Sequence, residues 1–536
     1  MKAPRIPPHK IFTREVRSGQ KTTSIVGVLI IVFGGAVSST SPTAAADTGN
    51  PTRLFVKEVP LRVLGRDTTV IAVEQADGTQ GYQPQAAAGF QVEVVNQLKV
   101  PTAMHWHGLI LPNLMDGVPF ITQEPIQPGG VFRYNFPFKQ SGTYWMHSHY
   151  GLQEQYLAAA PLIIWTDEER SKAARQYVVD LTDFSFTPPA DILKNLKKGM
   201  PMPAAGTGGK KAAMPKMGAG PAIEMKAQVW KDDSQSFSSA IVRAPTPDVD
   251  VSYDALLANR RTLDDPEVLS VNPGETVLLR LIAAASSTSF QIDTGTLMGE
   301  IVAVDGKGVQ PLKGNIFQLA TAQRLDLRFT IPSTGGAFPI LAQGEGTKLL
   351  CGVVLSTPGA KWSPKSPTEI RAAIPAALLD NTQERRLRAL HPLTSRPPDR
   401  SLPAVLGGNM MKFIWTINGR AYPNRDALVV RRGERVQMIM TNQTQMGHPM
   451  HLHGHDFQVV AIDGEQLSGA LRDTVMVPPG SSVTIAFDAD NPGVWAFHCH
   501  LLYHLASGMF TVVKYEDADT RYWTPEKTTK EILGLR

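Results

Sequence analysis

The sequence contains few of the residues that crosslink, charge or anchor a protein chain. Only two cysteines, Cys351 and Cys499, occur in 536 residues, so at most one disulfide bond can form. Charged residues make up 19% of the chain and hydrophobic residues 42%, which excludes a wholly disordered, collagen-like or coiled-coil protein. After residue 46, no stretch is apolar over the roughly 20 residues that a membrane-spanning helix needs.

Glycine and proline, in contrast, are abundant, with 45 and 41 residues. Because these residues separate short strands by turns, the composition favours an all-β fold. At about 150 residues per domain, a chain of 536 residues is expected to form three or four domains.

Basic residues are concentrated at the N-terminus. Residues 1–46 contain six Lys or Arg and one Glu, then an apolar run at 25–37 and small residues up to Ala46. This order predicts a secretory signal cleaved near Ala46, and hence a periplasmic protein if the cell is bacterial. An uncleaved membrane anchor is the alternative reading of the same segment.

The formal net charge of +5 comes from this predicted signal. Residues 47–536 carry 47 basic and 47 acidic side chains, so the mature chain is formally neutral. We therefore expect no nucleic-acid partner and no stable membrane span after signal cleavage.

Three stretches of the chain share one pattern, in which a strand-like run leads through a turn to a second strand. The first runs of the three copies are 90–96, 274–280 and 433–439, and their companion segments are 132–149, 325–343 and 483–500. Self-similarity at intervals of about 160–185 residues indicates three copies of one β-sandwich domain.

The domain organisation follows from these repeats and from two segments that do not resemble a packed core. We predict a signal peptide at 1–46, a first domain at 47–167, a second domain at 168–358 with a Met-rich insert at 196–226, a linker at 359–405 that could include a short helix at 367–378, and a third domain at 406–536. The middle copy lacks the histidine pairs of the other two, so we interpret it as a spacer.

Ten of the thirteen histidines fall in four clusters. The clusters are His105 and His107; His147 and His149; His448, His451 and His453; and His498, His500 and His504. On a strand, side chains two residues apart point to the same face, so each His-x-His pair presents two imidazoles together. Imidazole nitrogens suit copper or zinc far better than calcium or magnesium.

The last cluster favours copper over zinc. Alternation along a strand places Cys499 on the opposite face from His498 and His500. Together with His448, His504 and Met509, Cys499 supplies two imidazoles, one thiolate and one thioether, the ligands of a blue-copper site. The other cysteine, Cys351, lies in the apolar run 349–355 and is expected to pack in a core, although a disulfide between the two cysteines remains possible.

These motifs make the chain similar to multicopper oxidases of the three-domain, laccase-like and bacterial copper-resistance type. The matching segments are His105-Trp-His-Gly108, His147-Ser-His149, His448-Pro-Met-His-Leu-His-Gly454 and His498-Cys-His-x3-His-x4-Met509, and the resemblance covers about residues 50–515. It implies three cupredoxin-like Greek-key β-sandwich domains, four copper ions, and a cluster that takes ligands from the first and third domains.

The resemblance also implies a role for each ligand. His448, Cys499, His504 and Met509 would hold a mononuclear blue copper; His105 and His451 would hold the single copper of a trinuclear cluster; His107, His147, His149, His453, His498 and His500 would hold its coupled pair. Cys499, flanked by His498 and His500, would provide a covalent path for electrons between the sites. Dioxygen would be reduced to water at the cluster.

Asp116 matches the position of the family's proton-relay acid, although an Asp-Gly pair is also typical of a tight turn. Tyr503 lies where some relatives have a Glu, so the sequence assigns no second proton donor. For Trp106 and Trp145, beside the ligands, we expect packing roles.

The substrate is less well determined by the sequence. Five methionines in the insert 196–226 offer thioethers, which favour Cu(I), and a flexible low-complexity loop is the alternative interpretation. We expect Cu(I), small phenols or both as electron donors, with a slight preference for Cu(I) or broad activity. A copper-binding or storage protein without turnover, and a structural cupredoxin protein, are the other classes considered.

Overall fold

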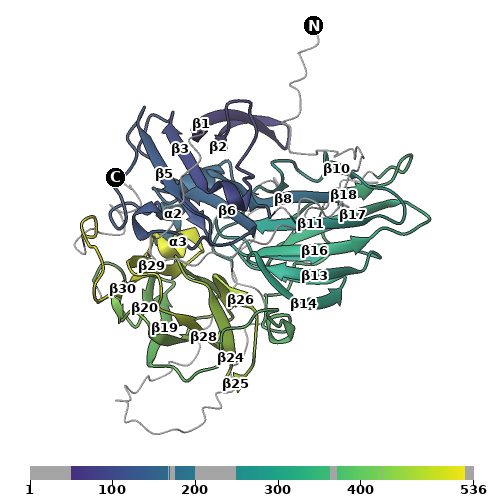
Figure 1. The fold of residues 1–536 in the computed structure, drawn as a ribbon. Coiled ribbons are helices and arrows are strands. Elements are labelled where there is room, and N and C mark those ends of the chain that lie inside the picture. Colours follow the sequence, from purple (N-terminus) through teal and green to yellow (C-terminus); the bar gives the residue numbers. More distant parts are fainter. Residues whose placement is uncertain are drawn as a thin grey trace, which may run out of the picture.

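The computed structural model describes residues 50–198, 249–362, 371–424 and 426–524, apart from 167 and 169–174. The described residues form six sheets and a few short helices (Figure 1), which confirms the all-β prediction. The predicted signal peptide and the methionines of the insert lie outside the described residues.

The N-terminal part of the chain forms two sheets. One has the strand order β2-β1-β3-β5 and the other β4-β6-β7. Their strands are β1 (Thr52–Val63), β2 (Arg66–Glu74), β3 (Phe90–Asn96), β4 (Met104–His107), β5 (Val131–Phe136), β6 (Gly142–Ser148) and β7 (Ala159–Ile164).

The middle of the chain forms two larger sheets, with the orders β14-β13-β16-β11-β8-β9 and β10-β18-β17-β12-β15. Their strands are β8 (Arg175–Phe184), β9 (Ala255–Ala258), β10 (Glu267–Ser270), β11 (Thr276–Ala283), β12 (Phe290–Asp293), β13 (Gly299–Val304), β14 (Lys307–Gly314), β15 (Ile316–Leu319), β16 (Arg324–Thr330), β17 (Ala337–Gly344) and β18 (Leu350–Ser356).

The C-terminal part contains the remaining two sheets, with the orders β20-β19-β22-β28-β24-β25 and β21-β30-β29-β23-β27, and β26 pairs with β24. Their strands are β19 (Arg400–Asn409), β20 (Ile414–Ile417), β21 (Leu428–Val430), β22 (Arg435–Asn442), β23 (His448–Leu452), β24 (Phe457–Ile462), β25 (Glu465–Gln466), β26 (Leu471–Arg472), β27 (Thr474–Val477), β28 (Ser482–Asp488), β29 (Val494–Cys499) and β30 (Phe510–Tyr515).

The helices are short connections between strands. They are η1 (Ala86–Ala88), η2 (Asn113–Met115), η3 (Gln153–Tyr156), α2 (Pro189–Lys197), η5 (Glu384–Arg386) and α3 (Leu502–Leu505). Within the described chain, none of the helices is long and apolar enough to cross a membrane.

The same strand pairing occurs in all three parts. A first strand pairs in parallel with a later one: β1 with β3, β8 with β11, and β19 with β22. Each of these later strands then pairs antiparallel with β5, β16 or β28. The repeated sequence segments therefore occupy equivalent positions in three similar sandwiches.

The helix suggested within 367–378 is absent from the part of it that the structure describes, 371–378. Pro375 has no amide hydrogen to donate, and the neighbouring amides bond outward to the second domain. Ala372 donates to the carbonyl of Lys348 and Ala376 to that of Thr347. This segment therefore lies along the second domain without forming a helix.

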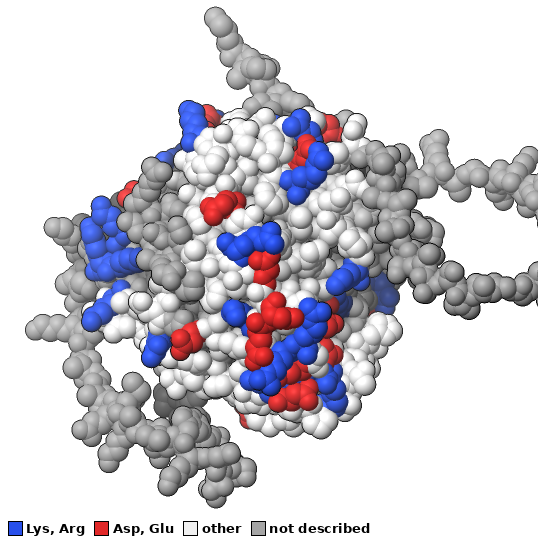
Figure 2. Space-filling model, turned by 60° about the vertical axis from the view of Figure 1, so that its left-hand side comes forward, with Lys and Arg blue, Asp and Glu red and all other residues white. Residues whose placement is uncertain are grey.

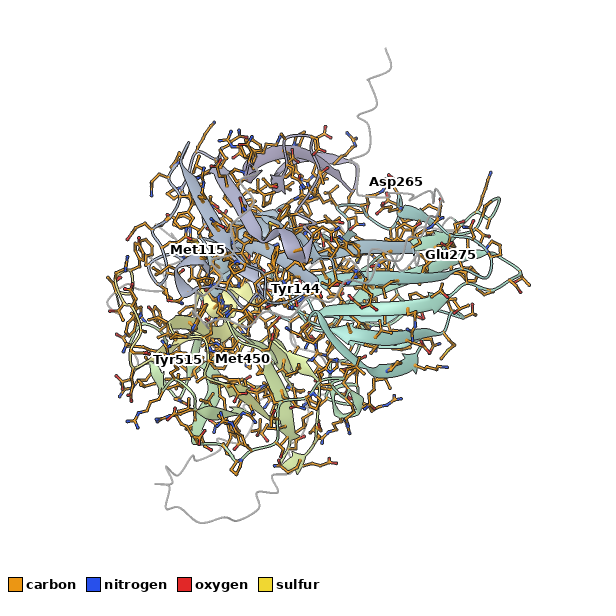
Figure 3. All side chains as sticks on the ribbon, viewed as in Figure 1. Met115, Tyr144, Asp265, Glu275, Met450 and Tyr515 are labelled. Atoms are coloured by element: carbon orange, nitrogen blue, oxygen red, sulfur yellow. The ribbon has the colours of Figure 1, made fainter. Side chains whose placement is uncertain are left out.

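The first and third parts share one continuous hydrophobic core. Buried side chains from Leu54 to Leu196 belong to the same cluster as those from Ala404 to Tyr515. The middle part has a core of its own around β11 and β16. Tyr144, on β6, lies near the centre of the molecule where the three parts meet (Figure 3). The histidine-bearing strands of the first and third parts thus meet directly.

Surface charges of opposite sign lie close to one another. In the largest charged cluster on the face seen in Figure 2, basic and acidic side chains alternate over neighbouring positions. Ion pairs among exposed or half-exposed side chains include Arg385 with Asp463 and Arg328 with Glu300.

Candidate copper centre

Two pairs of antiparallel strands bring the histidines together. In the first domain, β4 and β6 place His105 directly opposite His147. In the third domain, β23 and β29 place His451 directly opposite His498. Because the two domains share a core, these two strand pairs face each other, and histidines more than 300 residues apart in the chain become neighbours.

Eight histidines form one buried group at this interface. Their ring nitrogens converge in three sets, each within 4.8 Å, of which the first two share His107: His105, His107 and His451; His107, His147 and His500; and His149, His453 and His498. Every set contains residues from both domains. The predicted single-copper ligands, His105 and His451, fall in one set, and the six predicted pair ligands divide equally between the other two.

Hydrogen bonds from outside the group orient several of these rings. His105 Nδ1 lies 2.8 Å from the Asp116 carbonyl, and His451 Nδ1 lies 2.8 Å from the Asp473 carbonyl. A carbonyl only accepts, so Nδ1 of each ring carries the proton and Nε2 has a free lone pair. His107 has the reverse orientation, because its Nε2 lies 3.1 Å from Asp473 Oδ1.

Several ring nitrogens without a hydrogen-bond partner among the described residues point into the histidine group. His105 Nε2, His451 Nε2, His147 Nε2 and His107 Nδ1 are buried and have no hydrogen-bond partner within the described residues. Buried polar atoms are normally paired, so several unpaired lone pairs at one point fit a set of metal ligands. The residues present therefore fit copper ions bound by imidazole.

Burial also keeps these imidazoles neutral. It lowers the pKa of His498 to about 4, and it lowers the pKa values of His107, His147, His149, His451, His453 and His500 well below the ordinary range. Neighbouring histidines lower them further, because two imidazolium ions repel each other. A neutral imidazole is the form that binds a metal.

The second predicted site is a separate buried cluster around Cys499. Its Sγ lies 3.6 Å from His448 Nδ1 and 3.7 Å from His504 Nδ1, and these two nitrogens lie 3.1 Å apart. Met509 is buried, and its backbone bonds to those of His504 and Cys499. Burial raises the pKa of the Cys499 thiol, so a thiolate here requires a nearby cation.

The outer nitrogens of this cluster have polar partners. His448 Nε2 lies 2.7 Å from Thr444 Oγ1, and His504 Nε2 lies 2.6 Å from Asp250 Oδ2. Both contacts leave Nδ1 directed at Cys499. Asp250 has no sequence motif around it, and only the fold brings it to His504.

Asp116, the predicted proton-relay acid, lies against the larger group. Its Oδ2 is 2.9 Å from His453 Nδ1, and its Oδ1 is 3.2 Å from His105 Nδ1. The side chain is almost fully buried. Gly117 permits this close approach, because its φ is +83° and an added Cβ would overlap the Met104 carbonyl.

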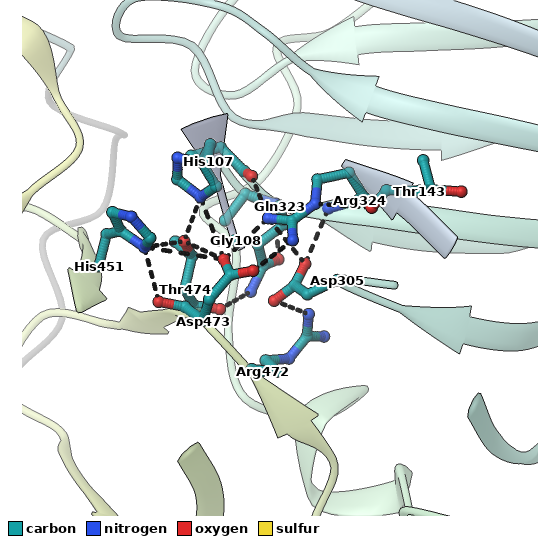
Figure 4. Close-up of polar contacts among 12 residues, drawn as sticks. His107, Gly108, Thr143, Asp305, Gln323, Arg324, His451, Arg472, Asp473 and Thr474 are labelled. Atoms are coloured by element: carbon teal, nitrogen blue, oxygen red, sulfur yellow. Dashed lines mark hydrogen bonds and ion pairs between the residues drawn. The ribbon is translucent and has the colours of Figure 1, made fainter. Parts of the chain in front are cut away.

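Two further carboxylates, which the sequence did not indicate, contact the histidines. Glu154 lies in η3, five residues after His149, and Asp473 lies between β26 and β27. Asp473 is part of a buried ion network that joins the second and third domains (Figure 4). No local pattern identifies either residue, because each also contacts a histidine of another domain: Glu154 lies near His500 and Asp473 lies near His107.

The network in Figure 4 alternates positive and negative groups. Arg324 binds Asp473 and Asp305, and Arg472 binds Asp305 and Glu384. Burial alone would lower the pKa values of the two arginines, but the adjacent carboxylates raise them above the ordinary value. Through Asp473, this network supports His107 and His451.

The remaining predicted residues have packing or hydrogen-bonding roles. Trp145 stacks on His147 with ring centroids 4.4 Å apart, and Trp106 packs on Phe90 at 4.6 Å. Tyr503 donates a hydrogen bond of 3.1 Å to Gln155 Oε1. Cys351 is buried in the second-domain core, and both cysteines are free, so the possible disulfide between them is absent.

Taken together, three similar sandwiches, an eight-histidine group between two of them and a separate Cys-His-His cluster define a copper protein of the cupredoxin-like class. The chain matches the family described as multicopper oxidase over residues 67–169, 228–355 and 395–519. It is 33% identical to multicopper oxidase MmcO of Mycobacterium tuberculosis, over 79% of each chain. It is 28% identical to copper resistance protein A of Escherichia coli, over 95% of this chain and 100% of that one.

Solved structures share the fold. The structure of Fet3p, a multicopper oxidase that functions in iron import, matches with a TM-score of 0.67 at 21% identity, covering 90% of this chain and 94% of that one. A laccase from Botrytis aclada matches with a TM-score of 0.62 at 19% identity, covering 90% of both chains. The prediction of three cupredoxin-like domains is confirmed.

This chain belongs to the multicopper oxidase family. It is an oxidoreductase that uses dioxygen as electron acceptor and four copper ions as cofactors.

Proposed function

We propose that the eight-histidine group and the Cys499 cluster bind different coppers, as the sequence motifs imply. His448, Cys499, His504 and Met509 hold the mononuclear copper; His105 and His451 hold the single copper of the trinuclear cluster; His107, His147, His500 and His149, His453, His498 hold the two coppers of its pair. When bound, the coppers supply one-electron steps from the substrate and a four-electron reduction of dioxygen to water.

The observation that carries this assignment is the position of Cys499 between two ligand sets. Its side chain lies with His448 and His504, whereas His498 and His500, its neighbours in sequence, belong to the other group. The backbone of three consecutive residues therefore connects the two sites. In addition, Asp116 lies within hydrogen-bonding distance of a histidine in the larger group, as a proton donor would require.

We propose that the electron donor is Cu(I), a small phenol or both. Asp250 supports either choice, because its carboxylate lies against the outer edge of His504 and can attract a cation or accept a hydrogen bond from a hydroxyl group. The similarity to copper resistance protein A and the methionines of the insert 196–226 favour Cu(I) slightly.

Steady-state oxygen uptake with Cu(I) and with a phenol tests the substrate proposal. Two variants are compared with the unaltered chain: a deletion of residues 200–225, and a full-length variant in which Met200, Met202, Met214, Met217 and Met225 are replaced by Leu. If the thioethers deliver Cu(I), both variants lose Cu(I) oxidation and keep phenol oxidation. Unchanged Cu(I) kinetics in both would contradict a role of the insert, and a protein that consumes no oxygen with either donor would contradict the proposed substrates.

We further propose that the protein is exported, and periplasmic if the cell is bacterial. The supporting feature is the order of basic, apolar and small residues in 1–46, which lie outside the described residues. Fractionation of cells, with the N-terminus of the exported chain determined by mass spectrometry, tests both the location and cleavage near Ala46.

A further inference from the structure

Glu154 is a buried acid beside the histidine group. It lies in η3, and only 5% of its side chain is exposed. One carboxylate oxygen, Oε2, is 3.3 Å from His147 Nδ1, and the other, Oε1, is 3.8 Å from His500 Nδ1. One carboxylate thus reaches a histidine of the first domain and a histidine of the third.

The position of Glu154 is similar to that of Asp116, which lies beside the other subsite of the predicted copper pair. Asp116 also reaches one histidine from each domain, His105 and His453. His453 belongs to the set with His149 and His498, whereas His147 and His500 belong to the set with His107. Each half of the pair therefore has its own carboxylate, and both carboxylates come from connections between strands of the first domain.

The contacts of His147 fix which of its nitrogens carries the proton. Its Nδ1 faces the Ser148 carbonyl at 3.3 Å as well as Glu154. The Ser148 carbonyl only accepts hydrogen bonds, so Nδ1 carries the proton and the Nε2 lone pair points toward His107 and His500.

The orientation of the His500 ring depends more strongly on Glu154 than that of the His147 ring does. Its Nδ1 makes no hydrogen bond within the described residues, and neither does Glu154 Oε1, the atom that faces it. A small rotation of the His500 ring would bring these two buried atoms into hydrogen-bonding distance. The described ion pairs of Glu154 are those with the two histidines, so a cation bound between the rings would also compensate this buried charge.

We propose that Glu154 is the positioning residue of the subsite formed by His107, His147 and His500. Its carboxylate accepts Nδ1–H of His147 and of His500, and it thereby directs both Nε2 atoms at one copper ion. This inference rests on the ligand assignment proposed above.

The decisive variant is Glu154→Gln, which keeps the shape but presents an amide NH2 to one of the two Nδ1–H groups. Loss of such an outer hydrogen bond typically weakens metal binding by about 10–100-fold. We expect the purified variant to lose about one copper per chain during dialysis against a chelator, while the blue absorption of the mononuclear site persists. The metal-free variant should unfold at the same temperature as the metal-free parent or a higher one, because a buried carboxyl group whose Oε1 makes no hydrogen bond within the described residues is replaced by a neutral amide.

Gln155→Ala is the matched control. Gln155 lies in the same short helix and is buried, but its contacts are with Asp183, Tyr253, Ser286 and Tyr503 instead of a histidine. We expect this variant to lower the unfolding temperature of the metal-free protein and to retain copper.

Two outcomes would overturn the inference. One is full copper retention by Glu154→Gln; the other is a copper loss that accompanies an equal fall in metal-free stability in both variants. An unaltered protein that binds fewer than four coppers would contradict the ligand assignment instead, so the two failures can be distinguished.

Discussion

The histidines of the larger group are oriented by acceptors that lie outside it. Backbone carbonyls hold His105 and His451, and the Asp116 carboxylate holds His453. Such contacts reduce the freedom of each ring before a metal binds, so less conformational entropy is lost on binding. The ring orientation is thus a property of the polypeptide itself.

At the scale of single residues, we predict that Asp116→Asn slows dioxygen reduction. An amide cannot donate a proton as a carboxylic acid does, and general acid catalysis contributes about 10²–10⁴-fold to a rate. Oxygen uptake at saturating electron donor measures the effect, with copper content determined on the same sample.

Asp264→Asn serves as the control for this substitution, because Asp264 is exposed and lies far from both clusters in sequence. It should leave the rate unchanged. An Asp116→Asn enzyme with full copper and the parental rate would remove Asp116 from the mechanism.

Among the elements, the loop after β4 has the strictest steric requirement. It carries Asp116 back over the strand, and Gly117 lies so close to β4 that a Cβ would be 1.8 Å from the Met104 carbonyl oxygen. No rotation of a side chain can relieve a clash between a Cβ and the backbone. The glycine is therefore required by packing as well as by its positive φ.

We predict that Gly117→Ala destabilises the protein much more than Gly129→Ala. Both glycines have positive φ, +83° and +75°, but nothing lies within 4 Å of a Cβ at 129. The left-handed conformation costs about 1–2 kcal/mol in both, and forced displacement of β4 adds about 1–3 kcal/mol at 117. Thermal unfolding of the two variants compares these costs, and equal melting temperatures would show that the loop can move away from β4.

At the level of secondary structure, the sequence predicted the first strand of each repeated segment. The strand pattern at 90–96, 274–280 and 433–439 corresponds to β3, β11 and β22, since alternation of apolar residues is a local property. The suggested helix at 367–378 failed over 371–378, because Pro375 and the hydrogen bonds to the second domain outweigh the helix propensity of the alanines.

For the whole molecule, a buried ion network links the sandwiches. Arg324, on β16 of the second domain, binds Asp473 of the third domain, and its Nε donates to the Thr143 carbonyl of the first. The middle sandwich lacks the histidine pairs, but it supports the copper site through this arginine.

We predict that Arg324→Gln lowers the thermal stability strongly and that Arg328→Gln does not. Both arginines lie on β16, but Arg324 is fully buried whereas 45% of the Arg328 side chain is exposed. Removing one partner of a buried ion pair costs about 3–5 kcal/mol, and an exposed pair contributes about 0–1 kcal/mol. Calorimetry and limited proteolysis of the domain linkers measure the difference; equal melting curves would contradict the role of the network.

What the sequence determined by itself is the chemistry of the ligands. Residues two apart on a strand share a face in any fold, so the His-x-His pairs and the separation of Cys499 from His498 and His500 follow from the spacing alone. The tertiary structure decided which histidines lie within 4.8 Å of one another and which acids contact them. Glu154 reaches His500, Asp250 reaches His504 and Asp473 reaches His107 through packing between domains, and such contacts depend on tertiary structure and not on any local pattern.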